Sequence, residues 1–319
     1  MKKNKQTRLI EEIKRRLPDD SKLTDVLTKT LGISKEAAYR RLRNEVPFTF
    51  EETAILAKDF GISLDNMVGV EVQKSKPFQL KLPEFVYPKN EDIFMFDDFI
   101  GFLKKLVTLP NTESGTITNA IPQDIFSGFF YLMKFNLFKW QYYYHNNDVI
   151  HFHDLVVCDK VKDSMNIQFQ QSKHIKNSYF IFDNHIYERI VNDLKFFKNI
   201  QLIKDEDISK IKDDLLNSLD YLESLTFSGR FPETNNRISI YITNVDITTS
   251  YSYIKSDETN YSLIKTFLLT SATSLDTKIS LKIQDWIKAS IRTSTLISQV
   301  NEIERIIFFR TQREMVNSI

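Results

Sequence analysis

Two Gly-Ile-Ser triplets constrain the first 70 residues of this chain more than any other feature. They occupy residues 32–34 and 61–63, and each follows a stretch whose apolar residues recur at helical spacing. A glycine in this place readily adopts the positive φ that ends a helix, and a serine two residues later caps the next helix with its side-chain oxygen. The triplets therefore predict short helices joined by tight turns.

The apolar spacing predicts four helices in this region, with one further turn after Ser63. Pro18 and Pro47 each follow a helical pattern, and a proline stops a helix because it lacks the N–H and clashes with the preceding turn. Thr49 is placed to cap the fourth helix. The predicted helices span residues 7–17, 23–31, 35–45 and 50–60.

A family resemblance follows from the residues between Leu23 and Gly69, which read LTDVLTKTLGIS, KEAAYRRLRNE and VPFTFEETAILAKDFGISLDNMVG. With its LGIS turn and its closing FGISLD frame, this run resembles the lambda-repressor/Cro-like, or XRE-type, helix-turn-helix family over residues 5–70. The resemblance implies an all-α DNA-binding domain at residues 1–70, double-stranded DNA as a partner and a homodimer. Thr24 stands where many members have a phosphate-binding glutamine, and Thr28 replaces the usual small alanine.

The helix that begins after Ser34 carries the residues expected to read DNA. In such a motif this helix enters the major groove, and its first residues reach base edges. If Ala38 faces the domain core, the opposite side of the helix faces the bases. Lysine and arginine suit guanine, glutamate suits the cytosine amine, and tyrosine suits a thymine methyl group or a phosphate. The expected base-contacting residues are Lys35, Glu36, Tyr39 and Arg40.

A second set of side chains is expected to contact phosphates and so to position the domain without reading sequence. The alternative is that the arginines of this set and of its neighbours only solvate an exposed helix. The expected phosphate-contacting residues are Lys22, Thr24, Ser34, Arg41 and Arg43.

Charge is unevenly distributed along the chain, although its net charge is only +1. Residues 1–43 contain 13 lysines and arginines against 6 aspartates and glutamates, so the rest of the chain has an acidic excess. A basic N-terminal region followed by an acidic remainder of the chain favours binding of a polyanion at the N-terminal region. A solvated basic helix would explain the same imbalance.

The remaining three-quarters of the chain predicts a linker and a second, larger domain. Residues 71–90 contain Pro77, Pro83 and Pro88 without helical periodicity, which indicates an extended linker. Residues 91–319 are expected to form an α+β domain that dimerises or senses a signal, because strands and helices follow one another irregularly. Short links between the last strands predict an antiparallel sheet. The predicted helices are 91–109, 163–177, 185–198, 205–225, 276–292 and 294–316, and the predicted strands are 148–158, 178–182, 237–245, 249–255 and 261–271.

Two segments of this second domain allow alternative interpretations. The aromatic segment after Pro122 suits a buried helix, or a strand toward its end. The last segment contains a set of apolar residues near a heptad-like stripe, namely Leu296, Val300, Ile303, Ile307 and Phe308. It suits either a C-terminal dimerisation helix or a helix that packs on its own domain.

Catalytic and cofactor-binding signatures are scarce in the sequence. The seven glycines form no GxGxxG or GxxxxGK[ST] motif, which disfavours dinucleotide and P-loop chemistry, and no GxSxG or HExxH motif occurs. His151 and His153 have a spacing that suits metal ligands on a strand, but no second cluster completes a site. Cys158, the single cysteine, is expected to be a buried, inert thiol. We therefore expect no enzyme activity, no cofactor and no metal.

The function most consistent with these features is sequence-specific transcription regulation. The alternatives are an antitoxin-type or other protein-interaction module, and an enzyme with an attached DNA-binding domain. The absence of a membrane-spanning apolar stretch, of a signal-peptide pattern and of a disulfide framework predicts a cytoplasmic protein without a membrane partner. The operator, the direction of regulation and any small-molecule or protein effector are not encoded in a recognisable motif.

Overall fold

The computed structural model describes residues 4–17, 22–64, 67, 78–144 and 150–319. The chain divides into two compact units, and the division falls after Pro77. Within the described residues, none of the helices has the length and apolar character needed to cross a membrane. The two units are described separately below.

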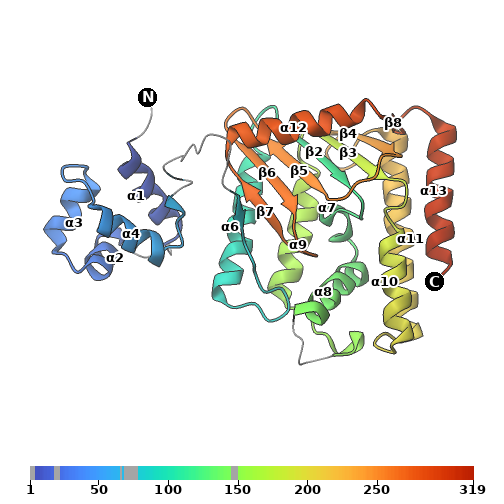
Figure 1. Ribbon diagram of the computed structural model, residues 1–319, viewed down its shortest axis with the longest axis horizontal. Helices are drawn as coiled ribbons and strands as arrows, with labels where there is room; N and C mark the ends of the chain where they lie inside the picture. The colour runs from blue at the N-terminus through green and yellow to red at the C-terminus, as the bar shows by residue number, and fades with distance from the viewer. Residues whose placement is uncertain (1–3, 18–21, 65–66, 68–77, 145–149) are drawn as a thin grey trace. The chain divides into compact units, whose positions relative to one another are not determined.

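The N-terminal unit is a small all-α bundle around one apolar core (Figure 1). Its helices are α1 (Lys5–Arg15), α2 (Leu23–Leu31), α3 (Lys35–Leu42) and α4 (Phe50–Asp59). Every helix contributes at least one residue to the core, so the bundle depends on the packing of all four helices rather than on any helix alone. The buried core residues are Leu9, Ile13, Leu27, Ala38, Leu56, Ala57 and Ile62.

The helix boundaries of this unit follow from local capping chemistry. Gly32 and Gly61 have φ values of 64° and 58°, the left-handed conformation expected of glycine at a helix end. The Ser34 side chain accepts a hydrogen bond from the Ala37 N–H, and Thr49 forms a reciprocal capping box with Glu52. The predicted caps at Gly32, Ser34, Thr49 and Gly61 are thus confirmed.

The third predicted helix is shorter than expected. The prediction extended it to Glu45, but α3 ends at Leu42. Asn44 has a φ of 61°, which a continuing right-handed helix does not allow. The last residues of the predicted helix form a turn instead.

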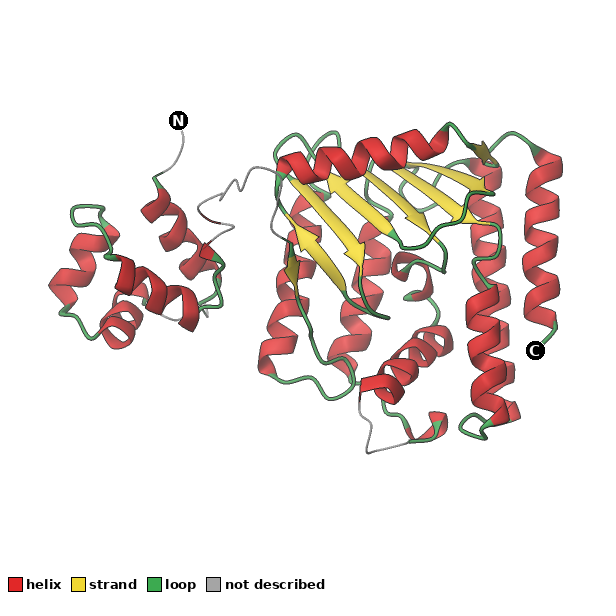
Figure 2. Cartoon of the chain, viewed as in Figure 1, coloured by secondary structure: helices red, strands yellow, loops and turns green. Residues whose placement is uncertain are grey.

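The C-terminal unit is built on a mixed sheet of eight strands, counted over the described residues (Figure 2). The sheet order is β1-β7-β6-β5-β2-β3-β4-β8. The neighbours β2-β3 and β3-β4 are parallel, and all other neighbouring pairs are antiparallel. The strands are β1 (Gln79–Leu80), β2 (Glu113–Thr118), β3 (Asn177–Asp183), β4 (Arg237–Thr243), β5 (Tyr251–Lys255), β6 (Asn260–Lys265), β7 (Ser271–Ser274) and β8 (Ser294–Leu296).

Helices cover both faces of this sheet, and each face has its own core (Figure 1). Helix α12 (Thr277–Ile291) packs on one face, where Ile117 and Ile181 meet Ile283 and Ile287. The other face carries the larger core, to which β3 contributes Phe180. The helices are α6 (Asn90–Leu106), α7 (Gln123–Phe126), α8 (Phe130–Tyr144), α9 (Asp159–Ser172), α10 (Glu188–Asn199), α11 (Asp205–Ser228), α12 (Thr277–Ile291) and α13 (Glu302–Asn317).

The prediction of an antiparallel sheet is correct only in part. Strands β5 and β6 pair antiparallel as expected, but the predicted strand 261–271 ends at Lys265, and β7, which was not predicted, pairs antiparallel with β6. Strand β4, which was predicted to join the antiparallel strands, pairs parallel with β3 instead, because helices α10 and α11 return the chain to the starting edge of β3 before β4 begins. The central strand β2 was not predicted at all. The C-terminal unit is therefore an α+β domain with a mixed sheet.

Two further predictions for this unit are corrected. The described part of the predicted strand 148–158 contains no strand, and Phe152–Asp154 form a turn of 3-10 helix. The predicted linker 71–90 ends earlier than expected, since β1 pairs with β7 and Phe85 and Val86 are buried in the larger core. Residues 71–77 lie outside the described residues.

Candidate nucleic-acid interface

Helix α3 has one buried side and one exposed side within its own unit. Ala38 is fully buried, and Leu42 packs against the same core. The opposite side is exposed and carries all four residues that were predicted to read bases. These residues are Lys35, Glu36, Tyr39 and Arg40.

The predicted phosphate-contacting residues fall into two groups. Lys22, Ser34 and Arg43 are exposed, and Thr24 is half-buried in the first turn of α2. Ser34 lies at the start of α3, where unpaired backbone N–H groups and the helix dipole favour an anion. Arg41, like Thr24, is half-buried.

Arg41 is engaged inside the N-terminal unit. Its Nε and Nη2 atoms donate to the two carboxylate oxygens of Glu52 at 3.0 and 2.6 Å, and its Nη1 donates to the Ala37 carbonyl at 3.2 Å. The two charged side chains are only 14% and 15% exposed. This bidentate pair ties α3 to α4, so Arg41 holds the helix in place rather than extending toward a ligand.

Electrostatics within the unit favour keeping this pair charged. Burial opposes the ionised form of Glu52, but hydrogen bonds from Arg41 and from the Thr49 backbone outweigh it and lower the pKa of the Glu52 carboxyl. The same carboxylate completes the capping box of α4. Glu52 thus connects the orientation of α3 to the start of α4.

The exposed cations of α3 make only weak contacts with neighbouring carboxylates. Lys35 lies 2.9 Å from Asp25, and both side chains are more than half exposed; this hydrogen bond lowers the pKa of Asp25 and raises that of Lys35. Arg40 and Arg43 approach Glu45 only at 4.0 and 3.8 Å. Exposed pairs of this kind cost little to break, so the three cations remain available to a polyanion.

Two residues that sequence reasoning did not single out support this surface. The Gln6 amide on α1 donates to the carbonyls of Arg41 and Val46 and accepts from the Phe48 N–H. Arg16 donates to the carbonyls of Phe60 and Gly61 at the end of α4. These contacts fix the loop after α3 and the end of α4, and no local sequence pattern reveals them because the partners are about 35–45 positions away.

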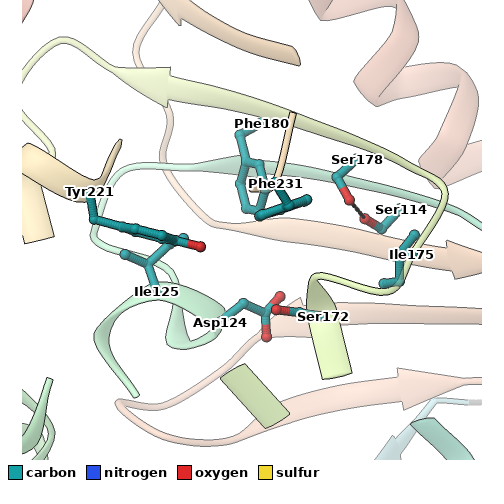
Figure 3. Close-up of a pocket in the computed structure, with 9 residues that line it drawn as sticks. All are labelled: Ser114, Asp124, Ile125, Ser172, Ile175, Ser178, Phe180, Tyr221 and Phe231. Atoms are coloured by element: carbon teal, nitrogen blue, oxygen red, sulfur yellow. Dashed lines mark hydrogen bonds between the residues drawn. The ribbon is translucent and has the colours of Figure 1, made fainter. Parts of the chain in front are cut away.

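The C-terminal unit contains a small internal cavity that Figure 3 shows in close-up. Burial raises the pKa of Asp124, whose carboxylate accepts a hydrogen bond from Gln168 at 2.7 Å, and the Tyr221 hydroxyl has no hydrogen-bond partner among the described residues. The volume is about 10 Å³, which admits about one water molecule. This cavity is too small for an effector. It is lined by Ser114, Asp124, Ile125, Ser172, Ile175, Ser178, Phe180, Tyr221 and Phe231.

The candidate metal ligands do not form a site in the described part of the chain. The rings of His151 and His153 lie 5.4 Å apart, and both histidines approach Asp154. No group of three or more His, Cys, Asp or Glu side chains within the described residues is arranged to hold a metal ion. Cys158 is half-buried and precedes α9.

Comparison with known proteins gives no match to any family model, curated protein or solved structure.

Proposed function

We propose that the N-terminal unit binds double-stranded DNA through α3 and that the chain is a sequence-specific transcription regulator. The observation that carries this proposal is that α3 has one buried side and one exposed side. Its apolar side is anchored by Ala38 and by the Arg41–Glu52 pair, and its other side presents Lys35, Tyr39 and Arg40 to solvent within the unit.

Each exposed residue has a role that its chemistry suits. Arg40 and Lys35 donate to guanine O6 and N7 in the major groove, Glu36 accepts from the cytosine amine, and Tyr39 contacts a thymine methyl group. Lys22 and Arg43 contact phosphates on either side, together with the N–H groups at the start of α3 near Ser34. Arg41 is excluded from this set because its guanidinium is committed to Glu52.

A single unit of this size makes too few contacts for a useful degree of specificity. The proposed regulator therefore acts as a homodimer whose two N-terminal units read two half-sites. Two units related by a two-fold axis require half-sites about 34–36 Å apart, or one turn of DNA.

The experiment that tests the proposal is selection of random double-stranded DNA with the purified full chain, followed by affinity measurements on the selected sequence. Arg40→Ala should lose about 1–3 kcal/mol of specific binding, roughly 5- to 150-fold in Kd, and should relax the choice of base at one position. Arg189→Ala, which removes an exposed arginine from α10 of the other unit, is the charge-matched control and should bind like the wild type.

The same selection experiment can also refute the proposal. A chain that enriches no sequence, or an Arg40→Ala variant that binds as tightly as wild type, would show that α3 does not read DNA. The protein-interaction alternative would then be the better explanation of the exposed face of α3.

A further inference from the structure

Helix α13 presents a continuous apolar stripe to solvent. Its inner side is buried and includes Phe308, Phe309 and Val316, and it packs against α10 and α11 at the outer end of the C-terminal unit (Figure 1). On the opposite side, Ile303, Ile306 and Ile307 are 71%, 51% and 47% exposed.

The spacing of these isoleucines makes them one surface. Positions i, i+3 and i+4 lie on the same side of a helix, so the three side chains form a contiguous patch that Arg310 and Glu314 extend by two further turns. Single exposed apolar residues are common, but a contiguous apolar stripe with a polar margin marks an interaction surface.

The charges of α13 point to the occupant of this surface. Glu302 and Glu304 lie in the first turn, whereas the exposed cation of the stripe, Arg310, lies in the second half of the helix. The other arginine of the second half, Arg313, is committed to Asp220 and Glu223 of α11. The helix is thus acidic at its start, and its exposed cation beyond the middle, Arg310, makes only a 4.0 Å contact with Glu314 of the same helix, which costs little to break.

A second copy of α13 in antiparallel orientation would cover the apolar stripe and would bring these opposite charges together. With a two-fold axis between Ile306 and Ile307, these two isoleucines of the two copies meet at the centre, and Ile303 lies level with Arg310 of the other copy. At a rise of about 1.5 Å per residue, Arg310 of one copy falls within roughly 2 Å, along the helix axis, of Glu302 and Glu304 of the other. The two helix dipoles are also opposed, which a parallel pairing would not provide.

We propose that the exposed stripe of α13, formed by Ile303, Ile306, Ile307 and Arg310, is the contact through which two copies of this chain form an antiparallel, two-fold symmetric dimer. A two-fold contact buries the same patch on both copies. The patch is small, so the dimer is expected to dissociate at low micromolar concentration. The dimer contact rests on α13 alone, and only its use in pairing two DNA half-sites rests on the function proposed above.

The oligomeric state of the full chain, measured without DNA by sedimentation at low to high micromolar concentration, tests the contact. Wild type should shift from monomer to dimer, and the double variant Ile306→Glu/Ile307→Glu, which places glutamates opposite glutamates at the proposed axis, should remain monomeric with an unchanged circular dichroism spectrum. Val156→Glu is the control, because it introduces the same charge at an apolar side chain that is 81% exposed on a loop. A wild type that stays monomeric, or a double variant that dimerises like wild type, would overturn the proposal.

Disulfide crosslinking separates the antiparallel arrangement from a parallel one. Ile306→Cys lies next to the proposed axis and should crosslink two copies on mild oxidation, whereas Glu314→Cys should not, because it lies about two turns from the axis and its counterpart lies equally far on the other side, about four turns away. Efficient crosslinking at both positions would indicate a parallel pair and contradict the proposal.

A further pair of variants keeps this test independent of DNA binding. Arg40→Ala should dimerise like wild type even if it loses DNA, and Ile306→Glu/Ile307→Glu should lose dimerisation even if the chain never binds DNA. Loss of dimerisation in Arg40→Ala would contradict the assignment of the contact to α13.

Discussion

At the scale of single residues, the most instructive contrast is between neighbouring arginines. Arg40, Arg41 and Arg43 are equivalent as a sequence pattern, and sequence reasoning assigned all three to DNA. The structure leaves Arg40 and Arg43 59% and 71% exposed, and it pairs Arg41 with Glu52, eleven positions later. One residue step along a helix turns a side chain by about 100°. Arg41 therefore faces Glu52 of α4, whereas its neighbour Arg40 points in another direction.

Buried charge is the second residue-scale feature. Lys265 of β6 is half-buried, and the charges of Lys139 and Asp124 act on its ammonium group. Removal from water, reinforced by the positive charge of Lys139 and partly offset by Asp124, lowers the pKa of the Lys265 ammonium to about 8. The folded protein therefore disfavours the charged form that the unfolded chain keeps up to about pH 10.4.

Replacing this lysine should stabilise the protein at neutral pH. Lys265→Met removes the charge at similar volume, and we expect a gain of about 1–3 kcal/mol at pH 7. Wild type regains stability as the pH rises from about 8 toward 10.4, because the unfolded chain then binds more protons than the folded one. Urea unfolding of both proteins at pH 7 and 9.5 measures the difference, and an equal difference at the two pH values would contradict the prediction.

At the scale of elements, β2 shows why a central strand escaped prediction. Its sequence, ESGTIT, contains one large apolar residue, Ile117. On the side of the larger core its hydroxyl groups pair with those of β3, of β5 and of the residue just before β5: Ser114 with Ser178, Thr116 with Ser252 and Thr118 with Ser250. On this side the strand carries hydroxyl groups rather than an apolar stripe, so no hydrophobic alternation marks it.

Gly115 of β2 occupies a place where a side chain does not fit. The Tyr253 ring of β5 lies over it, and an added Cβ would come within 2.4 Å of the ring; the Tyr253 hydroxyl donates to Glu113 at 2.7 Å and so holds the ring there. Gly115→Ala should therefore lower the free energy of unfolding by about 1–3 kcal/mol.

The matched control for this change is Gly101→Ala. Gly101 lies in α6 with nothing within 4 Å of an added Cβ, and alanine there should stabilise the helix by about 0.5–1 kcal/mol. Thermal unfolding of both variants should give shifts of opposite sign. Equal shifts would show that the Tyr253 ring moves aside without cost.

At the scale of the whole molecule, charge distribution matters more than net charge. A chain with a net charge of +1 has no strong overall attraction for DNA, but the basic excess of residues 1–43 concentrates positive charge on the unit that contains α3. DNA binding by the full chain should consequently weaken steeply with salt, since each phosphate contact releases a counterion.

This salt dependence distinguishes the two classes of residue in the proposed interface. Arg43→Ala should reduce the slope of log Kd against log salt concentration by about one unit for each copy bound, and it should weaken binding to all sequences alike. Arg40→Ala should instead change the preference among sequences. Fluorescence anisotropy at several salt concentrations measures both, and an unchanged slope in Arg43→Ala would remove that residue from the phosphate-contacting set.

The sequence by itself determined the features whose causes are local. Interactions within a few residues explain the caps at Ser34 and Thr49, the left-handed Gly32 and Gly61, and helix α2 at Leu23–Leu31. The exposed side of α3 also follows from the local sequence. Only the tertiary structure decided the partner of Arg41, the place of β2 and β4 in a mixed sheet, and which side of α13 remains uncovered. Each of these depends on contacts between residues far apart in the chain, and no short pattern encodes such contacts because the fold as a whole brings the partners together.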